Sequence, residues 1–273
     1  MKYSKIPILF GLIFSTFQIC LAEVWDTGYR KINVVDTARY EIIYTHILND
    51  RVKNEKRVKD EMLSIGENHL VYGGYGNFQL DSIYSTFTKK PLFEEGRRLF
   101  KEYEPISDAL TVDIQNGVIN YFGKIFINYY KYTEPIPEFD WIITDETENI
   151  MGYECVKATT DWRGRKWNAW FSDIPINGGP WKFQGLPGLI LKVEDSEGDH
   201  SIYSIGTRND IFPIGYSDRA YTPTSREKYI GAEKDYSENA GRIMAESGMV
   251  EMTEDTKKEL AGRRRFYAPL ELE

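Results

Sequence analysis

The sequence predicts a β-rich α+β protein: a curved antiparallel sheet, arranged as a half-barrel-like meander, with a helical excursion and a C-terminal helical arm. Three observations predict this class. The 273 residues include 19 Tyr, 14 Phe and 6 Trp together with 22 Gly, and bulky flat side chains pack well on a pleated surface. From Trp141 onward, short strand-like runs alternate with turn residues, as in antiparallel meanders. Beyond Ile211 the composition becomes charged and Ala-containing, which favours helices.

The first 22 residues have the pattern of a signal peptide. Lys2 and Lys5 precede an apolar run over residues 6–17, and Ala22 stands before the acidic Glu23; a basic start, a short apolar run and a small residue define such peptides. The run is too short for a membrane-spanning helix of about 20 residues, and no later stretch approaches that length. We expect an exported protein, periplasmic or secreted, that is cleaved near Ala22 and has no transmembrane segment in the mature chain.

Cys20 raises the alternative of a lipoprotein, in which this residue would become the lipidated first residue. We favour cleavage after Ala22, because Ile19 stands where lipoprotein processing requires a small side chain. Only Cys155 then remains of the two cysteines, so burial alone must stabilise the core, without an intrachain disulfide.

The mature chain is acidic. Removal of residues 1–22 takes two lysines from the 34 basic residues, which leaves 32 against 42 acidic residues and a formal charge of −10. We expect no nucleic-acid partner, because affinity for phosphate backbones depends on clustered basic side chains.

Before residue 140 the pattern predicts strands with one helical interruption. The predicted strands cover residues 38–45, 61–65 and 69–72, with a charged hinge at 49–59 and a flexible loop at 73–76. Phe93, Arg97 and Phe100 keep a helical spacing after Pro91, which predicts the helical excursion. Asn116-Gly117 precedes residues 118–131, which are rich in Ile, Phe and Tyr, and predicts a hairpin.

The strands predicted in the centre of the chain are regularly spaced. They cover residues 141–144, 153–159, 166–171, 189–194 and 201–206. If the turn at Gly164 pairs its two arms directly, then Trp167, Ala169 and Phe171 share one face and Trp170 takes the other, wetter or concave, face.

Residues 174–194 form the corner around which the chain is organised. Leu186-Pro187-Gly188-Leu189 predicts a type II turn, with a positive φ at Gly188. Asn177-Gly178-Gly179-Pro180 predicts a second turn, and Gly185 lets the chain pass close to a neighbouring segment. The structural turn residues are therefore predicted to be Gly179, Pro180, Gly185, Pro187 and Gly188.

Residues 185–190 spell the hexapeptide that names the GLPGLI family, a group of secreted bacterial proteins of unknown function, and the chain resembles that family over most of its mature length. The further motifs that carry the resemblance are residues 152–158, 163–165, 169–171, 174–175, 179–183 and 267–272. Ala268 departs from the pattern, since Asn is frequent there. The resemblance is strongest over residues 141–194 and implies no activity.

The C-terminal region is predicted as an irregular linker followed by helices over 225–246 and 253–265. Thr253 with Thr256 is a helix cap, and Arg263, Arg264 and Arg265 suit the end of the second helix. The predicted organisation is a signal peptide (1–22), an antiparallel β domain that contains the GLPGLI block (23–210), and a linker with a C-terminal helical arm (211–273).

Residues with catalytic or metal-binding potential are few and scattered. His46, His69 and His200 lie far apart without metal-ligand spacing, so the sequence predicts neither a metal nor a cofactor. Cys155 stands mid-strand, where a buried thiol behaves as a small hydrophobic side chain.

We therefore favour a non-catalytic envelope binding module for a hydrophobic small molecule or a peptide. The predicted ligand-binding residues are Trp170, Trp181, Lys182, Phe183 and Leu186, in an apolar cleft. One alternative is a structural accessory of an outer-membrane complex, in which the charged C-terminal arm docks a protein partner. A third is a hydrolase that uses Asp140, Asp145 and Asp161, although nothing in the sequence pairs these carboxylates with a base.

Overall fold

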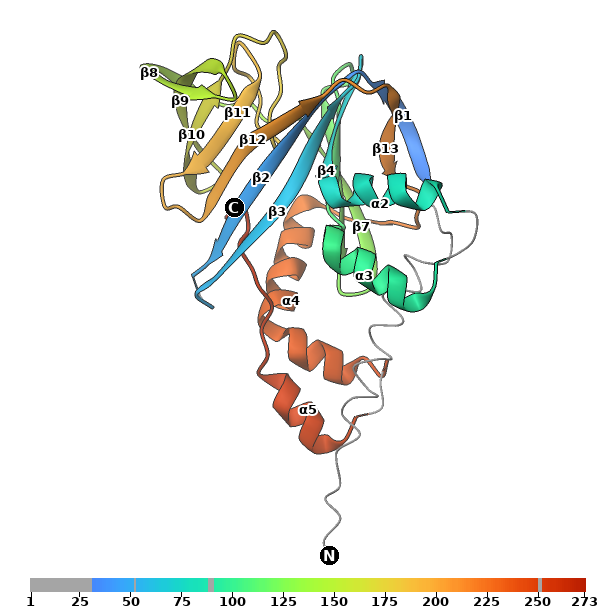
Figure 1. Cartoon of the computed structure of the whole chain (residues 1–273). Coiled ribbons are helices and arrows are strands. Elements are labelled where there is room, and N and C mark those ends of the chain that lie inside the picture. Colours follow the sequence, from blue (N-terminus) through green and yellow to red (C-terminus); the bar gives the residue numbers. More distant parts are fainter. Residues whose placement is uncertain (1–30, 52, 88–90, 250–251) are drawn as a thin grey trace, which may run out of the picture.

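The computed structural model of the chain describes residues 31–51, 53–87, 91–249 and 252–273 (Figure 1). Its strands are β1 (Ile32–Ala38), β2 (Tyr40–Asp50), β3 (Glu55–Ile65), β4 (His69–Gly74), β5 (Ala109–Asp113), β6 (Val118–Ile125), β7 (Asn128–Pro135), β8 (Ile142–Ile150), β9 (Tyr153–Trp162), β10 (Arg165–Phe171), β11 (Ile190–Asp195), β12 (His200–Arg208), β13 (Phe212–Ser217) and β14 (Thr222–Pro223). Its helices are α2 (Tyr75–Ser85), α3 (Phe93–Tyr103), α4 (Arg226–Glu246) and α5 (Glu254–Ala261). The predicted signal peptide and its cleavage site lie outside the described residues.

Twelve strands form one open sheet in the order β14-β7-β6-β5-β4-β3-β2-β12-β11-β10-β9-β8. Strands β2 to β7 form one meander and β8 to β12 a second, and the two join where β12 pairs with β2. Neighbouring strands are antiparallel except for β14 and β7, which are parallel. Short turns suffice between antiparallel neighbours, which explains why chain order and sheet order agree so closely. The predicted curved antiparallel sheet is confirmed, and it does not close into a barrel.

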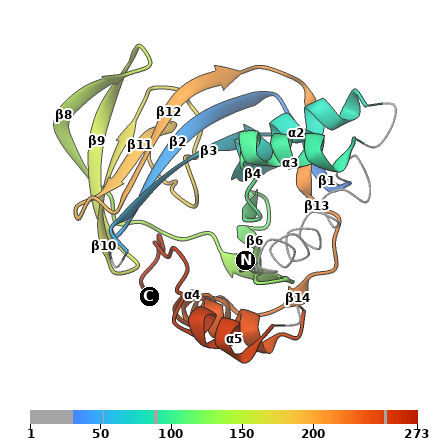
Figure 2. The same cartoon turned by 60° about the horizontal axis from the view of Figure 1, so that its bottom comes forward.

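The helices lie on the inner side of the curved sheet. In Figure 2 the sheet bends around an interior, with α2 and α3 beside β4 and with α4 and α5 across the interior from β2 and β3. Helix α4 contacts β6 and β7, and α2 contacts β3 and β4. The helices therefore face the concave side of the first meander. None of the described helices is long and apolar enough to cross a membrane.

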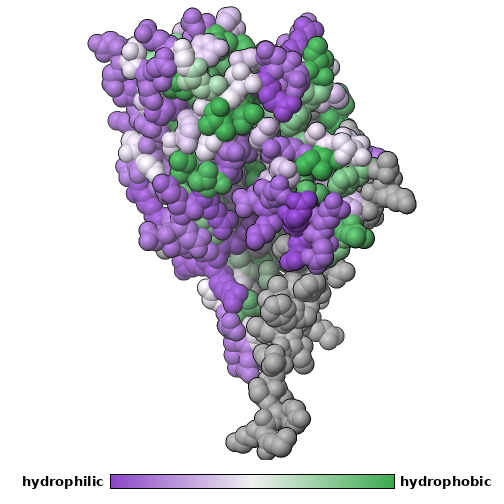
Figure 3. Space-filling model, viewed as in Figure 1, coloured by the Kyte–Doolittle hydropathy of each residue, from purple (hydrophilic) through white to green (hydrophobic). Residues whose placement is uncertain are grey.

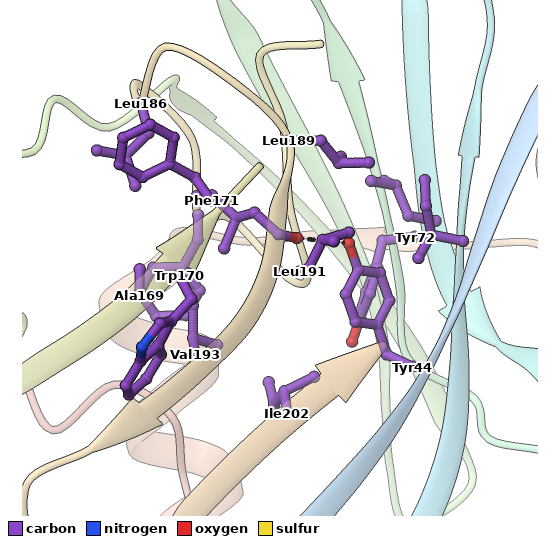
Figure 4. Packing of buried hydrophobic residues seen from close by; sticks show 14 of the residues in the cluster. Tyr44, Tyr72, Ala169, Trp170, Phe171, Leu186, Leu189, Leu191, Val193 and Ile202 are labelled. Carbon is purple, nitrogen blue, oxygen red and sulfur yellow. Dashed lines mark hydrogen bonds between the residues drawn. The ribbon is translucent and has the colours of Figure 1, made fainter. Parts of the chain in front are cut away.

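The main core lies between the second meander and the first strands of the sheet. Figure 4 shows Leu189, Leu191 and Ile202 in this core together with Tyr44 of β2. The Tyr44 hydroxyl donates a hydrogen bond of 2.8 Å to the carbonyl oxygen of Ile190, so this buried polar group is satisfied. The predicted apolar run at 189–194 is thus a core strand.

The corner at residues 174–194 folds differently from the predicted type II turn. Gly188 does not have a positive φ; the glycine of this corner that does is Gly185, with φ of 89°. Gly188 is required for another reason, since a Cβ there would stand 1.9 Å from the backbone oxygen of Ser172. The turn assignment at Gly188 was therefore wrong, because a Pro-Gly pair also suits a close approach between two backbones.

Gly179 and Pro180 form the other turn of this corner. The Pro180 carbonyl accepts a hydrogen bond of 3.2 Å from the amide of Phe183, and a Cβ at Gly179 would stand 2.7 Å from the Cβ of Ile190. Trp181, inside the turn, has φ of 57°, a conformation that is costly for a bulky side chain. Pro187 lies exposed on the outer side of the corner.

Three segments outside the corner differ from their predicted structure. The hinge predicted at 49–59 contains the start of β3, which pairs with β2 up to Asp50. The loop predicted at 73–76 is the end of β4 and the first turn of α2. The linker predicted after residue 210 contains β13, which pairs with β1, and β14. In each case long-range pairing or packing outweighs local charge and Gly content.

Both C-terminal helices begin at capping residues, of which Thr253 was predicted. The Ser225 hydroxyl accepts from the Lys228 amide at 3.4 Å, and the Thr253 hydroxyl accepts from the Thr256 amide at 3.2 Å. Helix α4 buries Tyr229, Tyr236 and Ala240 against aromatic side chains of β6 and β7. This part of the predicted arm therefore packs on the sheet.

Candidate functional site

The concave side of the sheet forms a half-open cavity of about 2250 Å³. Its walls come from strands β2 to β7 and β13 and from helices α2, α3 and α4. The lining combines apolar, aromatic and charged side chains. On the face shown in Figure 3, hydrophilic side chains predominate and hydrophobic ones form small separate patches.

One wall of the cavity is a cluster of aromatic rings. Tyr121 of β6 stacks on Tyr132 of β7 with ring centroids 4.8 Å apart, and Trp181 and Tyr229 meet Tyr121 edge to face at 5.7 and 5.1 Å. Tyr72 of β4 extends the cluster, 6.4 Å from Trp181. All five rings line the cavity. Tilted and offset contacts of this kind stabilise an aromatic wall beyond the burial of its area.

The predicted ligand-binding residues do not form one cleft. Trp181 lines the cavity, whereas Phe183 and Leu186 lie in the main core, where Phe183 packs 4.7 Å from Trp167. Trp170 is also buried, but it lies away from the cavity. It faces Lys157 and Lys192 on the neighbouring strands, and their ammonium groups stand 5.8 and 4.1 Å from its ring centroid. Of the five predicted residues only Trp181 lines the cavity, because Phe183 and Leu186 pack in the main core and Trp170 lies on another part of the sheet.

Lys182 is the centre of a buried ionic network. Its side chain is fully buried, and its ammonium group contacts Glu271 at 2.6 Å, Glu134 and the Tyr132 hydroxyl. Arg163 bridges the same two carboxylates at 2.8 Å each. Arg226 of α4 contacts Glu271 at 2.7 Å. Because every charge has an opposite partner, the network can be buried without an isolated ion.

This network joins three distant segments of the chain and gives them a structural role. Arg163 comes from the turn between β9 and β10, Lys182 from the corner, and Glu271 from the last residues of the chain. Residues 163–165, 179–183 and 267–272, which carried the resemblance, therefore meet in space. Lys182 contacts these protein groups behind the aromatic wall, and Trp181 covers it on the cavity side, since the Trp181 indole N–H donates to Glu271 at 3.1 Å.

Two carboxyl groups face the cavity next to the aromatic wall. Asp108 precedes β5 and accepts a hydrogen bond from the Tyr121 hydroxyl; burial raises its pKa, against the opposing effect of Lys59. Glu233 projects from α4, and burial followed by the charge of Asp108 raises its pKa to about 7. Two like charges in a poorly solvated space disfavour double ionisation. The pair can therefore accept hydrogen bonds and carry a charge that varies near neutral pH.

A chain of buried hydrogen bonds runs from the cavity to the C-terminal segment. Glu61 accepts from Tyr72 at 2.7 Å and contacts Lys59 at 2.8 Å; His46 lies 2.9 Å from Glu61 and 3.0 Å from His200. His200 in turn lies 3.0 Å from the carbonyl oxygen of Pro269.

The Pro269 carbonyl at the end of these hydrogen bonds determines which histidine nitrogens carry a proton. A carbonyl only accepts, so Nε2 of His200 donates to Pro269; His200 carries a single proton, because burial, then His46 and Arg165, lower its pKa to about 2. Nδ1 of His200 therefore accepts from Nε2 of His46. Burial raises the pKa of Glu61, but Lys59 and His46 outweigh this effect and hold the pKa well below its usual value. Burial, against the opposing effect of Glu61, lowers the pKa of His46, whose Nδ1 faces the Glu61 carboxylate.

Sequence reasoning missed most of these cavity residues. His46 and Glu61 stand on adjacent strands, and His200 joins them only because β12 pairs with β2. Asp108 and Glu233 come from a loop and a helix. The one available signal was the position of His46 and Glu61 within strongly strand-like runs, where a polar side chain on a buried face needs a partner.

The other residues considered for chemistry lie outside the cavity. Asp140, Asp145 and Asp161 are exposed and do not line it, which removes the basis for a hydrolase that uses them. Cys155 is buried, and burial raises the pKa of its thiol to about 11, as predicted for a structural thiol. Within the described ranges, no group of three or more His, Cys, Asp or Glu side chains is arranged to hold a metal ion.

Comparison with known proteins gives a family match without a function. A family model described as "Protein of unknown function (Porph_ging)" matches residues 163–192. This range includes Arg163, Lys182 and the hexapeptide at 185–190. No curated protein matches the chain. The likeness to the GLPGLI family stays a resemblance carried by the motifs themselves.

Solved structures match the chain at low identity. Two crystal forms of PNGF-II are 16% and 15% identical, cover 74% of this chain and 34% of theirs, and give TM-scores of 0.49 and 0.48. A domain assigned to an outer membrane lipoprotein-sorting protein of Vibrio parahaemolyticus is 8% identical, with 71% of this chain and 92% of that domain covered and a TM-score of 0.25. The chain thus spans about a third of the length of the PNGF-II chains.

Proposed function

We propose that the protein is a non-catalytic, exported binding module that holds a hydrophobic ligand or a peptide in the cavity on the concave side of its sheet. The observation that carries this proposal is the cavity itself. Its volume of about 2250 Å³ exceeds the range of about 300–1,000 Å³ that is usual for sites of small ligands. A long amphiphile or an extended peptide is therefore the class of ligand that matches it.

The lining supports a ligand with two kinds of surface. Trp181 is half-buried and offers its ring to an apolar part, and the buried rings of Tyr121 and Tyr229 support it from behind. Asp108 and Glu233 lie beside them and can accept hydrogen bonds from a hydroxyl, amide or amine group. Pockets with a mainly apolar wall and a few convergent polar groups orient their ligands in this way.

A cavity-filling variant tests this proposal. Ala109 of β5 is half-buried and lines the cavity, so the ring in Ala109→Trp would occupy part of the ligand space. Ala232 is exposed on α4 and does not line it, so Ala232→Trp adds the same ring at a neutral position. The probe is N-phenyl-1-naphthylamine, an apolar amine whose fluorescence rises in an apolar site.

We expect Ala109→Trp to weaken binding of this probe at least tenfold and Ala232→Trp to leave it unchanged. Circular dichroism and urea denaturation of all three proteins establish that each is folded. Equal probe affinity for the wild type and for a folded Ala109→Trp variant would contradict the proposal. An accessory role in an outer-membrane complex stays a prediction.

A further inference from the structure

The last residues of the chain occupy a groove made by distant parts of the fold. Residues 266–272 form neither helix nor strand. They run from the end of α5 past α4 to the ends of β2 and β12, where Figure 1 marks the C-terminus. We call these residues the tail segment, and the residues around them the tail groove. The residues of the tail groove are Asp50, Arg163, Arg165, Lys182, His200 and Arg226.

The tail groove binds the main chain of the tail segment at three points. The Tyr267 amide donates to Asp50 at 2.9 Å. The Pro269 carbonyl accepts from Arg165 at 2.9 Å and from His200 at 3.0 Å. The Leu272 amide donates to the carbonyl of Arg163 at 3.0 Å. Main-chain contacts of this kind give affinity for extended peptides, while side-chain pockets select among them.

The selective pocket of the tail groove is a carboxylate site. One oxygen of Glu271 contacts Lys182 at 2.6 Å and the Trp181 indole at 3.1 Å, and the other contacts Arg163 and Arg226 at 2.8 and 2.7 Å. Lys182 is only 1% exposed. Without Glu271, these three cations would have only Glu134 as a carboxylate partner in the network. The pocket would then be buried and positively charged, which strongly favours an acidic ligand.

The side chains beside Glu271 add a second requirement. Leu270 packs against the main core, and Phe266 lies under the guanidinium of Arg57 at 4.3 Å. A segment that fits therefore carries an apolar residue directly before its carboxylate. The tail segment occupies the carboxylate site and the three main-chain sites together, as a bound peptide would.

We propose that the tail groove is a peptide-recognition site and that the tail segment is its resident intramolecular ligand. The partner it fits is a protein that presents an extended segment with an apolar residue followed by Glu or Asp. Such a segment replaces the tail segment and binds the same main-chain and carboxylate sites. Residues 266–271 also line the cavity, so the tail groove adjoins it, and the two proposals are tested with different probes.

Competition by the tail segment sets the design of the test. A tethered ligand acts at an effective concentration in the millimolar range, so a free peptide binds the wild-type protein weakly. The full-length variant Glu271→Gln weakens the resident ligand and leaves the three cations in place. The probe is a fluorescein-labelled synthetic peptide with the sequence of residues 266–273, and fluorescence anisotropy measures its binding.

We expect the peptide to bind Glu271→Gln at least tenfold more tightly than it binds the wild type. A matched peptide with Gln in place of Glu271 should bind the variant at least tenfold more weakly, and a scrambled peptide of the same composition should behave like the Gln peptide. Failure of the peptide to bind the folded variant, or equal binding of all three peptides, would overturn the proposal.

A second variant keeps the test decisive if Glu271→Gln does not fold. Leu270→Ala loosens the tail segment through its apolar contact and retains both the carboxylate and its pocket. The same gain in affinity for the labelled peptide is expected, and its absence would count against the groove in the same way. Binding of N-phenyl-1-naphthylamine by the wild type, in which the tail segment is in place, reports on the cavity.

Discussion

Lys182 and Glu271 form a buried ion pair, with 2.6 Å between Nζ and Oε1, that ties the central corner of the fold to its last residues. Tyr132, Glu134, Arg163 and Arg226 complete the surroundings of the pair. This arrangement explains why a lysine stands between two large aromatic residues in the corner. Its ammonium group stabilises the joint between three distant segments of the chain.

Removal of this charge should destabilise the fold strongly. In Lys182→Met, Glu134 and Glu271 remain buried with fewer cations, and breaking a buried pair on one side costs about 3 kcal/mol. Urea denaturation measures the change in free energy of unfolding. The matched control is Lys192→Met, whose ammonium group pairs with Glu148 near the surface and whose loss should cost about 1 kcal/mol or less. Equal effects of the two substitutions would show that the Lys182 network does not stabilise the protein.

Gly188→Ala should destabilise the protein because of backbone proximity. The added Cβ would stand 1.9 Å from the Ser172 carbonyl oxygen, so the backbone must shift, and we expect a loss of more than about 2 kcal/mol. Gly152→Ala serves as control: its φ is 87° but the space around it is open, so only the backbone conformation costs energy, about 1 kcal/mol. If Gly188→Ala were the milder change in thermal or urea denaturation, the close approach would be refuted.

Glu233 should make stability depend on pH near neutrality. Its pKa is raised from 4.5 to about 7, so the folded state holds this proton more tightly than the unfolded state. Stability is then highest at low pH and falls as pH rises from about 4.5 to about 7, because the unfolded chain ionises first. Lys59, Arg265, Asp108 and Glu271 are the charged groups that act on Glu233.

Glu233→Gln removes this dependence. The variant should equal the wild type in stability near pH 4 and exceed it by about 2 kcal/mol above pH 8, once the shift is reduced for partial solvent access. Urea denaturation of both proteins from pH 4 to pH 9 measures the difference, and the other titrating groups cancel in the comparison. A constant difference across this range would mean that Glu233 ionises as it does in water.

The two tryptophans predicted to bind ligand should behave differently. Trp181 lines the cavity, and Trp170 lies under Lys157 and Lys192 away from it. Trp181→Ala should therefore raise the dissociation constant for N-phenyl-1-naphthylamine by about threefold or more, since a ring contact of about 1 kcal/mol is lost. Trp170→Ala should lower the melting temperature and leave the dissociation constant unchanged. The reverse pattern would place the apolar site on the other face of β10.

The sequence predicted the elements better than it predicted their contacts. Alternating aromatic and β-branched residues with short turns sufficed for the meander from β8 to β12, because these signals are local. Strand β3, which begins at Glu55, and strand β13, after residue 210, were not predicted at these positions. Both depend on pairing with other strands of the sheet. Their charge and Pro content pointed to irregular structure, and long-range pairing outweighed it.

The site was predicted only in part for a related reason. Trp181 was identified because a large ring between two turns must be held in a fixed place. Phe183 and Leu186 follow closely in sequence, yet they point into the core. Asp108 and Glu233 approach each other only after β5 and α4 have taken their places. The spacing of residues within one segment carries no information about a contact between two segments that are distant in the sequence.

The central claim is that the cavity holds a ligand, and native mass spectrometry of the protein, purified gently from its own cells, tests it most directly. The account predicts a folded chain that carries additional mass, released on denaturation as a hydrophobic molecule or a peptide and reduced in Ala109→Trp but not in Ala232→Trp. A chain whose mass equals that of the polypeptide alone, in every preparation and in both variants, would contradict it.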